Sequence, residues 1–258
     1  MDTSPAAASD DDYGDARAAA WYAARDDRTD RLLGYPFVFR ELELRERRGA
    51  CLLDFGCGPG VVAEHTARRY AVRVLAADTA PAMLHHIRGR KIPHASVHRI
   101  REGRIAELPD HCADAAMCNH VLTAVPDQDT LARIFDEIRR LLRPGAPFAA
   151  LTTDPGRVGI RYTCQQVGTA GGTYRPGDPL PLRLRYDDGS WREFHDFYWP
   201  PDIYPRLLKQ AGFTDIHQHH PTVAEAAAAP ETDARLLRSS PWTTERAAPP
   251  LLITAARA

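Results

Sequence analysis

Short apolar runs alternate with amphipathic stretches through the middle of the chain. The apolar runs have the length of strands and cover residues 50–54, 72–77, 95–100, 114–118 and 147–152. Apolar positions at helical spacing lie between them, over residues 61–70, 81–89 and 129–142. Neighbouring parallel strands need long crossover connections, and helices supply them. The pattern therefore predicts an α/β protein whose doubly wound, mostly parallel sheet has helices on both faces.

The alternation changes after residue 154. Residues 180–186 alternate apolar and polar side chains, Asp187-Asp188-Gly189 is a turn signal, and residues 190–199 alternate again. This combination predicts an inserted β-hairpin. The remaining pattern predicts one helix and two more strands, at residues 202–212, 213–219 and 250–256. With these two strands the predicted sheet has seven.

The segment before the first strand has a helical pattern from Asp15 to Glu43. The turn formers Gly34-Tyr35-Pro36 are expected to break it into two helices, which form an N-terminal helical cap. Residues 1–12 are rich in Ala, Ser and Asp and are predicted to be disordered. We divide the chain into a tail at 1–12, the cap at 13–46, a core at 47–154, a substrate-side insertion with the hairpin at 155–200, and the rest of the core sheet at 201–258.

The composition argues against several classes of protein. The 258 residues carry a formal net charge of -1, so no basic field attracts nucleic acid or an anionic membrane. No apolar run reaches the roughly 18 residues of a membrane-spanning helix. The first residues lack the basic start and apolar core of a signal peptide, so the expected location is the cytoplasm.

The cysteines and histidines indicate neither a disulfide framework nor a metal site. The five cysteines are an odd number and include no C-x-x-C pair. The histidine groups at His85-His86 and His217-Gln218-His219-His220 lack carboxylates at ligand spacing and fall at the edges of predicted elements. We therefore expect no bound metal.

The strongest chemical signal is a glycine-rich turn directly after the first predicted strand. Asp54-Phe55-Gly56-Cys57-Gly58-Pro59-Gly60 has an acid two residues before its first glycine, and a helical pattern begins at Val61. Glycines suit a backbone that bends sharply or lies against a ligand. Asp78 ends the next strand, where a nucleotide-binding βαβ unit places the carboxylate that binds ribose hydroxyls. The turn differs from the G-x-G-x-x-G fingerprint of dinucleotide sites, which indicates another nucleoside cofactor.

This arrangement resembles motif I of the class I S-adenosylmethionine-dependent methyltransferases, over about residues 50–153. The resemblance implies a Rossmann-like core, with the last strand of the sheet antiparallel, and S-adenosyl-L-methionine as the cofactor. The cofactor-binding residues that it implies are Asp54, Gly56, Cys57 and Gly58 at the amino acid portion, Gly60 at the helix approach, Asp78 at the ribose, and Thr79 and Met83 at the adenine.

The chain departs from this family where an acid usually accepts the adenine amino group. The family's acid precedes a Leu-Pro pair, whereas Arg104 holds its place in Arg104-Ile105-Ala106-Glu107-Leu108-Pro109. Either Ile105 covers the adenine and its backbone replaces the acid, or Glu102 or Glu107 takes the role through a shifted loop. Arg104 itself either stacks on the adenine or is a solvated surface residue.

Two further segments match the family near the cofactor. Asn119-His120-Val121-Leu122 follows the fourth strand and resembles the family's Asn-His-Val-Leu type segment, so Asn119 is expected to face the cofactor. His120 is a catalytic candidate that orders the acceptor or takes its proton, or else it is a packed residue. Trp21 and Tyr22 match an aromatic position that closes over the methionine part in relatives, the alternative being packing on a helix face.

The acceptor side carries a second, looser resemblance. The layout of Thr152–Gly156, the Tyr162 region and the hairpin is similar to small-molecule methyltransferases of bacterial secondary metabolism, in particular the toxoflavin-type azapteridine N-methyltransferases. One face of the second hairpin strand would enclose a flat acceptor, with His195 as a second catalytic candidate, or would pack on the sheet. The side chains on that face are Trp191, His195, Phe197 and Trp199.

Together these features predict a methyltransferase that transfers the methyl group of S-adenosylmethionine to N or O of a small, aromatic or heterocyclic metabolite, as in antibiotic biosynthesis. One alternative is a non-methylating reaction, such as cyclisation, at the same cofactor site. Another is a cofactor-binding regulatory or scaffold protein. The expected partner is a small-molecule acceptor, with the chain a monomer or homodimer and with no nucleic acid or membrane partner.

Overall fold

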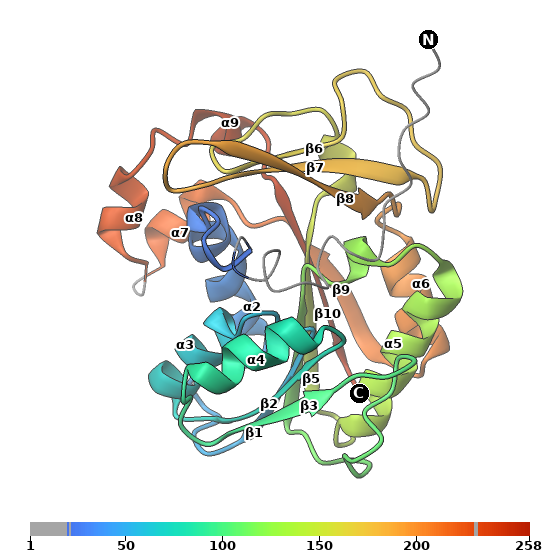
Figure 1. Cartoon of the computed structure of the whole chain (residues 1–258). Helices are drawn as coiled ribbons and strands as arrows, with labels where there is room; N and C mark the ends of the chain where they lie inside the picture. Colours follow the sequence, from blue (N-terminus) through green and yellow to red (C-terminus); the bar gives the residue numbers. More distant parts are fainter. Residues whose placement is uncertain (1–19, 21, 230–231) are drawn as a thin grey trace.

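The computed structural model describes residues 20, 22–229 and 232–258. The disorder expected for residues 1–12 and the roles considered for Trp21 lie outside the described residues. The described chain folds around a seven-stranded sheet of order β3-β2-β1-β4-β5-β10-β9 (Figure 1). Its strands are β1 Cys51–Phe55, β2 Arg73–Asp78, β3 Ala95–Arg99, β4 Ala115–Asn119, β5 Pro147–Thr153, β9 Thr214–His219 and β10 Leu251–Arg257.

The pairing of these strands confirms the predicted doubly wound, Rossmann-like sheet. Every neighbouring pair from β3 to β5 is parallel, whereas β10 is antiparallel to both β5 and β9. The carboxyl ends of the parallel strands therefore meet at one edge. Asp78 and Asn119 are the last residues of β2 and β4, and the glycine-rich turn follows β1. The sequence-predicted cofactor residues thus share the edge where ligands bind in such sheets.

Helices cover both faces of the main sheet. α2 Tyr35–Glu41, α3 Val61–Tyr70 and α4 Pro81–Gly89 pack on one face, and α5 Gln128–Leu141 and α6 Ile203–Gln210 pack on the other. α5 forms where the sequence has its apolar stripe, and Asp127 caps it by accepting the Thr130 N–H at 2.8 Å. In the described part of the segment between β9 and β10 there are three short helices, α7 Val223–Ala228, α8 Ala234–Arg238 and α9 Thr243–Ala247. Within the described ranges, the helices are too short or too polar to cross a membrane.

The insertion forms a second, antiparallel sheet that Figure 1 shows above the main one. β7 Pro179–Arg185 pairs with β8 Trp191–Phe197, which confirms the predicted hairpin. A third strand, β6 Gln165–Val167, pairs with the other edge of β7. The sequence does not reveal β6 because three residues are too few to establish an alternating pattern. Apolar side chains buried on one face of this sheet are Leu180, Leu182, Leu184 and Phe194.

The N-terminal cap differs from its prediction in where the helix breaks. The chain turns at residues 24–27 and is helical from Arg28 onward, with a π-helical turn, Asp30–Gly34, that continues into α2. The break predicted at Gly34-Tyr35-Pro36 is therefore wrong. Pro36 lies in the first turn of α2, where a missing N–H is tolerated. Gly34 serves packing instead, because a Cβ there would lie 2.7 Å from Leu151 of β5.

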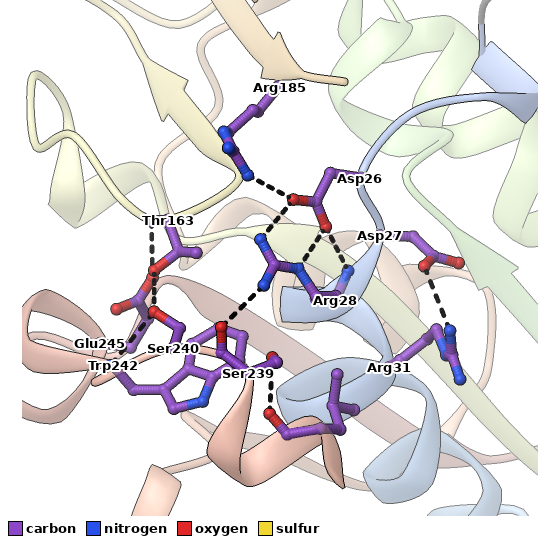
Figure 2. A network of polar contacts seen from close by, with 11 residues as sticks. Asp26, Asp27, Arg28, Arg31, Thr163, Arg185, Ser239, Ser240, Trp242 and Glu245 are labelled. Atoms are coloured by element: carbon purple, nitrogen blue, oxygen red, sulfur yellow. Dashed lines mark hydrogen bonds and ion pairs between the residues drawn. The ribbon is translucent and has the colours of Figure 1, made fainter. Parts of the chain in front are cut away.

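A charged cluster fixes the turn of the cap against the antiparallel sheet (Figure 2). The Asp26 carboxylate lies 2.7 Å from the Arg28 guanidinium and 3.0 Å from that of Arg185 on β7. Arg28 also donates to the carbonyl oxygen of Ser239, after α8, at 3.0 Å. Burial raises the pKa of Asp26, but the hydrogen bonds from Arg28 outweigh this and lower it. The cluster therefore joins the cap, the insertion and the C-terminal helices through one ionised carboxylate.

Candidate active site

The glycine-rich turn after β1 has the backbone that its sequence predicts. Gly56, Gly58 and Gly60 have φ angles of 76°, 52° and 82°, a region that residues with side chains rarely adopt. A Cβ on Gly56 would overlap the Val121 side chain, and a Cβ on Gly60 would overlap α4. Gly58 has open space beside it, because the nearest atom to a Cβ there is in the Tyr22 ring at 3.9 Å. The turn thus leaves backbone at Gly58 free to approach a ligand.

Asp78 closes this turn from the end of β2. Its carboxylate accepts the N–H of Gly58 at 2.8 Å and the N–H of Ala80 at 2.9 Å. Burial raises the pKa of Asp78, and these backbone hydrogen bonds oppose that rise. Each carboxylate oxygen has a second lone pair, so ribose hydroxyls can be bound as well. Asp78 therefore shapes the turn; it lines neither of the two cavities at this edge of the sheet, and its contact with ribose stays a prediction.

Asp54 and Asn119 carry buried polar atoms that no described residue satisfies. These atoms are Oδ2 of Asp54 and both side-chain heteroatoms, Oδ1 and Nδ2, of Asn119. Burial, with the neighbouring charge of Asp78, raises the pKa of Asp54 to about 7. Unpaired buried polar atoms are costly, so such a cluster indicates a polar ligand. The charged amino acid end of S-adenosylmethionine supplies both donors and acceptors, so the residues present fit this cofactor.

Two cavities adjoin each other beyond the carboxyl ends of β1 and β4. The cofactor cavity, of about 60 Å³, is lined by the glycine turn, Cys57, Asp54 and Asn119. The second cavity, of about 30 Å³, is lined by the cap, the end of β5 and the antiparallel sheet. Three side chains line both cavities and form a shared wall, namely Tyr22, Arg25 and His120. The wall is the place where groups from the two cavities come closest.

Asp30, in the π-helical turn, holds the shared wall in place. Its Oδ1 lies 3.1 Å from Nε2 of His120, and its Oδ2 lies 3.0 Å from the Arg25 guanidinium. Arg25 also donates to the Tyr35 hydroxyl at 3.1 Å and lies 4.5 Å above the Tyr22 ring. Burial raises the pKa of Asp30, but the charges of His120 and Arg25 outweigh burial and lower it. Asp30 is therefore an ionised, buried anchor for two residues of the wall.

The second cavity combines an apolar wall with a buried amide. Leu182 and Leu184 of β7 form the apolar part, and Gln165 of β6 and Asp196 of β8 also line the space. Gln165 is 5% exposed, and its Nε2 has no partner among the described residues. A ligand atom that accepts a hydrogen bond would satisfy this donor.

The face of β8 toward the second cavity is not the one expected from the sequence. Phe194 pairs across the hairpin with Leu182 on the buried face, and Asp196 lies on that same face two residues later. His195 points to the opposite face and lines neither cavity. Trp199 packs in the cluster of α5 and α6. The expectation that Trp191, His195, Phe197 and Trp199 enclose the acceptor is therefore corrected, and of the two candidate histidines the structure brings His120 to the cavities.

The residues expected around the adenine do not line the two cavities. Ile105 is fully buried, its N–H donates to Glu137 at 2.8 Å, and its carbonyl oxygen accepts from Arg140 at 3.3 Å. Both backbone groups of Ile105 are thus occupied, which argues against the backbone as a substitute for the missing acid. Glu107 pairs with a histidine of β3 at 3.2 Å, and Arg104 is exposed.

Thr79 and Met83 follow β2 beside the glycine turn. Met83 is buried with Ala80 in a small cluster against which Tyr22 packs, and Thr79 is exposed. Thioether contact with an adenine face is favourable, which is the basis of the expectation for Met83. The contacts of Thr79, Met83, Arg104 and Ile105 with adenine stay predictions.

Sequence reasoning missed the functional residues of the cap. Arg25 and Asp30 belong to the uninterrupted polar run Arg25-Asp26-Asp27-Arg28-Thr29-Asp30-Arg31, which apolar residues flank on the C-terminal side. Seven consecutive polar residues directly before an apolar helical segment are the signal that could have indicated a buried network of charges. Gln165 and Asp196 gave no such signal, because each is a single polar residue within a short strand.

The parallel sheet, the glycine turn after β1 with its adjoining cavity, and the acid at the end of β2 define a class I S-adenosylmethionine-dependent methyltransferase. Residues 53–150 match the methyltransferase domain family. The chain is 34% identical over 212 residues to the N-demethylindolmycin N-methyltransferase of Streptomyces griseus, with 81% of this chain and 89% of that protein covered. The chain belongs to the S-adenosylmethionine-dependent methyltransferases, and S-adenosylmethionine is its cofactor.

Solved structures share this fold. An S-adenosylmethionine-dependent methyltransferase from Mesorhizobium loti is 23% identical with a TM-score of 0.56, and the match covers 86% of this chain and 96% of that one. One from Aquifex aeolicus is 14% identical with a TM-score of 0.56, covering 94% and 98% of the two chains. At these identities the likeness concerns the fold alone.

Proposed function

We propose that this methyltransferase acts on a nitrogen of a small, aromatic or heterocyclic metabolite. The observation that carries the proposal is the second cavity, which shares a wall with the cofactor cavity. The cap, the end of β5 and the antiparallel sheet surround this cavity on different sides. Enclosure from several sides favours a small ligand over a macromolecular acceptor, which needs an open groove. At about 30 Å³ the cavity must widen to admit a ring.

The lining of the second cavity favours a planar acceptor with a polar edge. Leu182 and Leu184 offer an apolar surface, and Gln165 offers a buried donor to a carbonyl oxygen or ring nitrogen. A heterocycle provides both features in one molecule. This chemistry agrees with the resemblance to small-molecule methyltransferases of secondary metabolism, so we place the acceptor among such metabolites, antibiotics included.

The relatives favour nitrogen over oxygen as the methylated atom. The Streptomyces griseus relative is by name an N-methyltransferase and aligns over 89% of its length. A ubiquinone biosynthesis O-methyltransferase of Neisseria meningitidis is 33% identical over only 90 residues, 38% of that protein. An alignment of 212 residues extends well beyond the domain match at residues 53–150, so the first relative is the better guide to the acceptor.

The residues of the site act mainly by holding and shielding. Bound S-adenosylmethionine supplies a methyl group activated by its sulfonium. Asp54 and Asn119 bind the amino acid end of the cofactor, and Asp78 binds the ribose. The shared wall excludes water and sets how the acceptor faces the cofactor cavity, which is the main requirement of an in-line displacement. His120, on that wall, is placed to take the proton that the acceptor loses.

Transfer of a labelled methyl group tests this function. The protein is incubated with S-adenosylmethionine carrying a deuterated methyl group, with N-demethylindolmycin and with planar heterocycles that bear an N–H. Hydroxyl analogues of the same rings serve as matched acceptors. Mass spectrometry should find the deuterated methyl on nitrogen, with little label on the hydroxyl analogues. Preferred labelling of oxygen, or tight cofactor binding with no labelled acceptor in the series, would contradict the proposal.

A further inference from the structure

The backbone at His120 holds its side chain in an uncommon orientation. His120 has a φ of 56°, in the left-handed region that residues other than glycine rarely adopt. Its N–H donates to the carbonyl oxygen of Leu151 on β5 at 2.8 Å, which anchors this conformation. Strained backbone of this kind persists where surrounding contacts enforce it, and it is concentrated at functional sites. The strain here directs the imidazole into the shared wall between the cavities.

The contact with Asp30 sets which ring nitrogen of His120 carries the proton. Asp30 is ionised and only accepts hydrogen bonds, so Nε2 at 3.1 Å from its Oδ1 must carry a hydrogen. In the neutral ring Nδ1 is then an acceptor. No described residue forms a hydrogen bond with Nδ1. Among the residues that the structure describes, the nitrogen that can take a proton is therefore the one without a hydrogen bond.

Acidic side chains share both cavities with the His120 ring. In the second cavity, Asp26 and Asp196 line the space with His120, and in the cofactor cavity Asp27 and Asp54 do so. The cation common to both cavities is Arg25, whose charge Asp30 already pairs at 3.0 Å. The neighbouring phenols Tyr22 and Tyr35 have pKa values raised by burial, so they stay neutral. The carboxylate in contact with the imidazole is that of Asp30, at 3.1 Å.

We propose that Asp30 is a positioning residue that fixes His120 as the Nε2–H tautomer, so that Nδ1 accepts the proton of a nitrogen acceptor. This inference rests on the proposed function and narrows the acceptor to a nitrogen with a removable proton. The nitrogen lone pair forms the new N–C bond while the C–S bond breaks and its electron pair goes to sulfur. The proton leaves the nitrogen for Nδ1, and the imidazolium that results is paired by Asp30.

Nuclear magnetic resonance tests the tautomer without any acceptor. Protein with ¹⁵N-labelled histidine is examined by long-range ¹H–¹⁵N correlation at pH 8, with the His120 signals assigned by their loss in His120→Gln. The wild-type protein should show the Nε2–H tautomer at His120. His94→Asn is the matched control, because His94 is exposed at the amino end of β3 and its loss should leave the His120 signals unchanged. An Nδ1–H tautomer in the wild-type protein overturns the proposal.

Turnover of N-demethylindolmycin as the acceptor probe gives the second readout. Asp30→Asn should lower kcat by roughly 10- to 1,000-fold, with the KM for the probe and the Kd for S-adenosylmethionine changed by less than about threefold. Asp30→Glu should restore part of kcat, because it returns a carboxylate. The pH profile of kcat should differ between the wild-type protein and Asp30→Asn.

Failure of this proposal is distinguishable from failure of the proposed function. A wild-type-like kcat and pH profile in a folded Asp30→Asn variant overturns the positioning role and leaves nitrogen methylation standing. An Nε2–H tautomer with labelling of oxygen in the methyl-transfer assay leaves the Asp30–His120 arrangement standing and overturns nitrogen as the acceptor. If Asp30→Asn does not fold, the positioning role is tested by the wild-type tautomer and by Asp30→Glu, which should keep part of the wild-type kcat.

Discussion

Asp30 Oδ1 and His120 Nε2 lie 3.1 Å apart although 90 positions separate them in the chain. The contact joins the cap to the residue that follows β4, at the wall between the two cavities. Because the cap supplies Asp30, Arg25 and Tyr22, the second cavity is complete only when the cap is docked on the core. The cap also lines the cofactor cavity, through Tyr22, Ala23, Arg25, Asp27 and Tyr35, so acceptor binding and cofactor binding should both depend on the docked cap.

Replacement of Asp78 should weaken binding of the cofactor. Asp78→Ala removes the acceptor for the ribose hydroxyls and for the Gly58 N–H, which lies at 2.8 Å. Hydrogen bonds to a charged group contribute about 1.5–3 kcal/mol, so the Kd for S-adenosylmethionine in calorimetry should rise by roughly tenfold or more. Asp129→Ala, at an exposed position in the first turn of α5, is the control and should leave the Kd unchanged. An unchanged Kd in folded Asp78→Ala would remove Asp78 from the site.

Ionisation of Asp54 should make cofactor binding depend on pH. The pKa of this carboxyl is raised to about 7, and its ionised form favours the positively charged groups of S-adenosylmethionine. Affinity should therefore increase from pH 6 to pH 8, and in Asp54→Asn it should be weaker and nearly independent of pH. Calorimetry across this range measures both. A wild-type affinity that falls as the pH rises would show that Asp54 does not bind the cofactor's positive charge.

The same carboxyl should reduce the stability of the cofactor-free protein at high pH. Between the unfolded pKa of 3.8 and the folded value of about 7, the folded state binds the extra proton, so stability falls as the pH rises through this window. Asp54→Asn should therefore be more stable than the wild-type protein at pH 8, by on the order of 4 kcal/mol, and the difference should shrink toward pH 4. Urea unfolding at the two pH values checks this. Equal stabilities of the two proteins at pH 8 would mean that burial does not raise the pKa of Asp54.

Replacement of Arg104 should leave cofactor affinity unchanged, whereas replacement of Ile105 should lower stability. Arg104 is exposed, so Arg104→Ala should leave cofactor affinity within about twofold. Ile105 is fully buried, so Ile105→Ala should lower the free energy of unfolding by about 2–4 kcal/mol. Calorimetry and urea unfolding measure the two effects. Weaker cofactor binding in Arg104→Ala, with stability unchanged, would show that the guanidinium stacks on the adenine.

Loss of Asp26 should loosen the cap. Asp26→Ala leaves the guanidinium groups of Arg28 and Arg185 without their shared carboxylate, at 2.7 Å and 3.0 Å in the intact protein. Both arginines are partly exposed, so the stability cost should be only about 1–2 kcal/mol. Hydrogen exchange should increase in residues 25–35, and turnover should fall more than cofactor affinity. The control Asp188→Ala, in the exposed turn of the hairpin, should change neither hydrogen exchange nor turnover. Unaltered exchange in Asp26→Ala would show that Asp26 does not hold the cap in place.

Local sequence patterns predicted the main sheet and the cofactor turn, but they did not predict the acceptor side. Five apolar runs and the glycine turn each depend on neighbours in sequence, so the pattern located them. Pro36 misled the prediction because proline is tolerated in the first turn of a helix. On β8 both faces carry aromatic residues, so Phe194 and Trp191 gave no basis for choosing the buried face. The pairing of Asp30 with His120 joins distant positions, which no local pattern records.

The most direct test of the account is a crystal structure with S-adenosylhomocysteine, the demethylated cofactor. The account predicts its amino acid end on Asp54, Asn119 and the turn at Gly58, its ribose on Asp78, and its sulfur facing the shared wall at His120. The cavity lined by Gln165 should then adjoin that sulfur with no side chain between them, because in-line transfer needs the acceptor in contact with the methyl group. A sulfur directed away from His120, or a cofactor that fills the second cavity, would contradict the assignment of the two cavities.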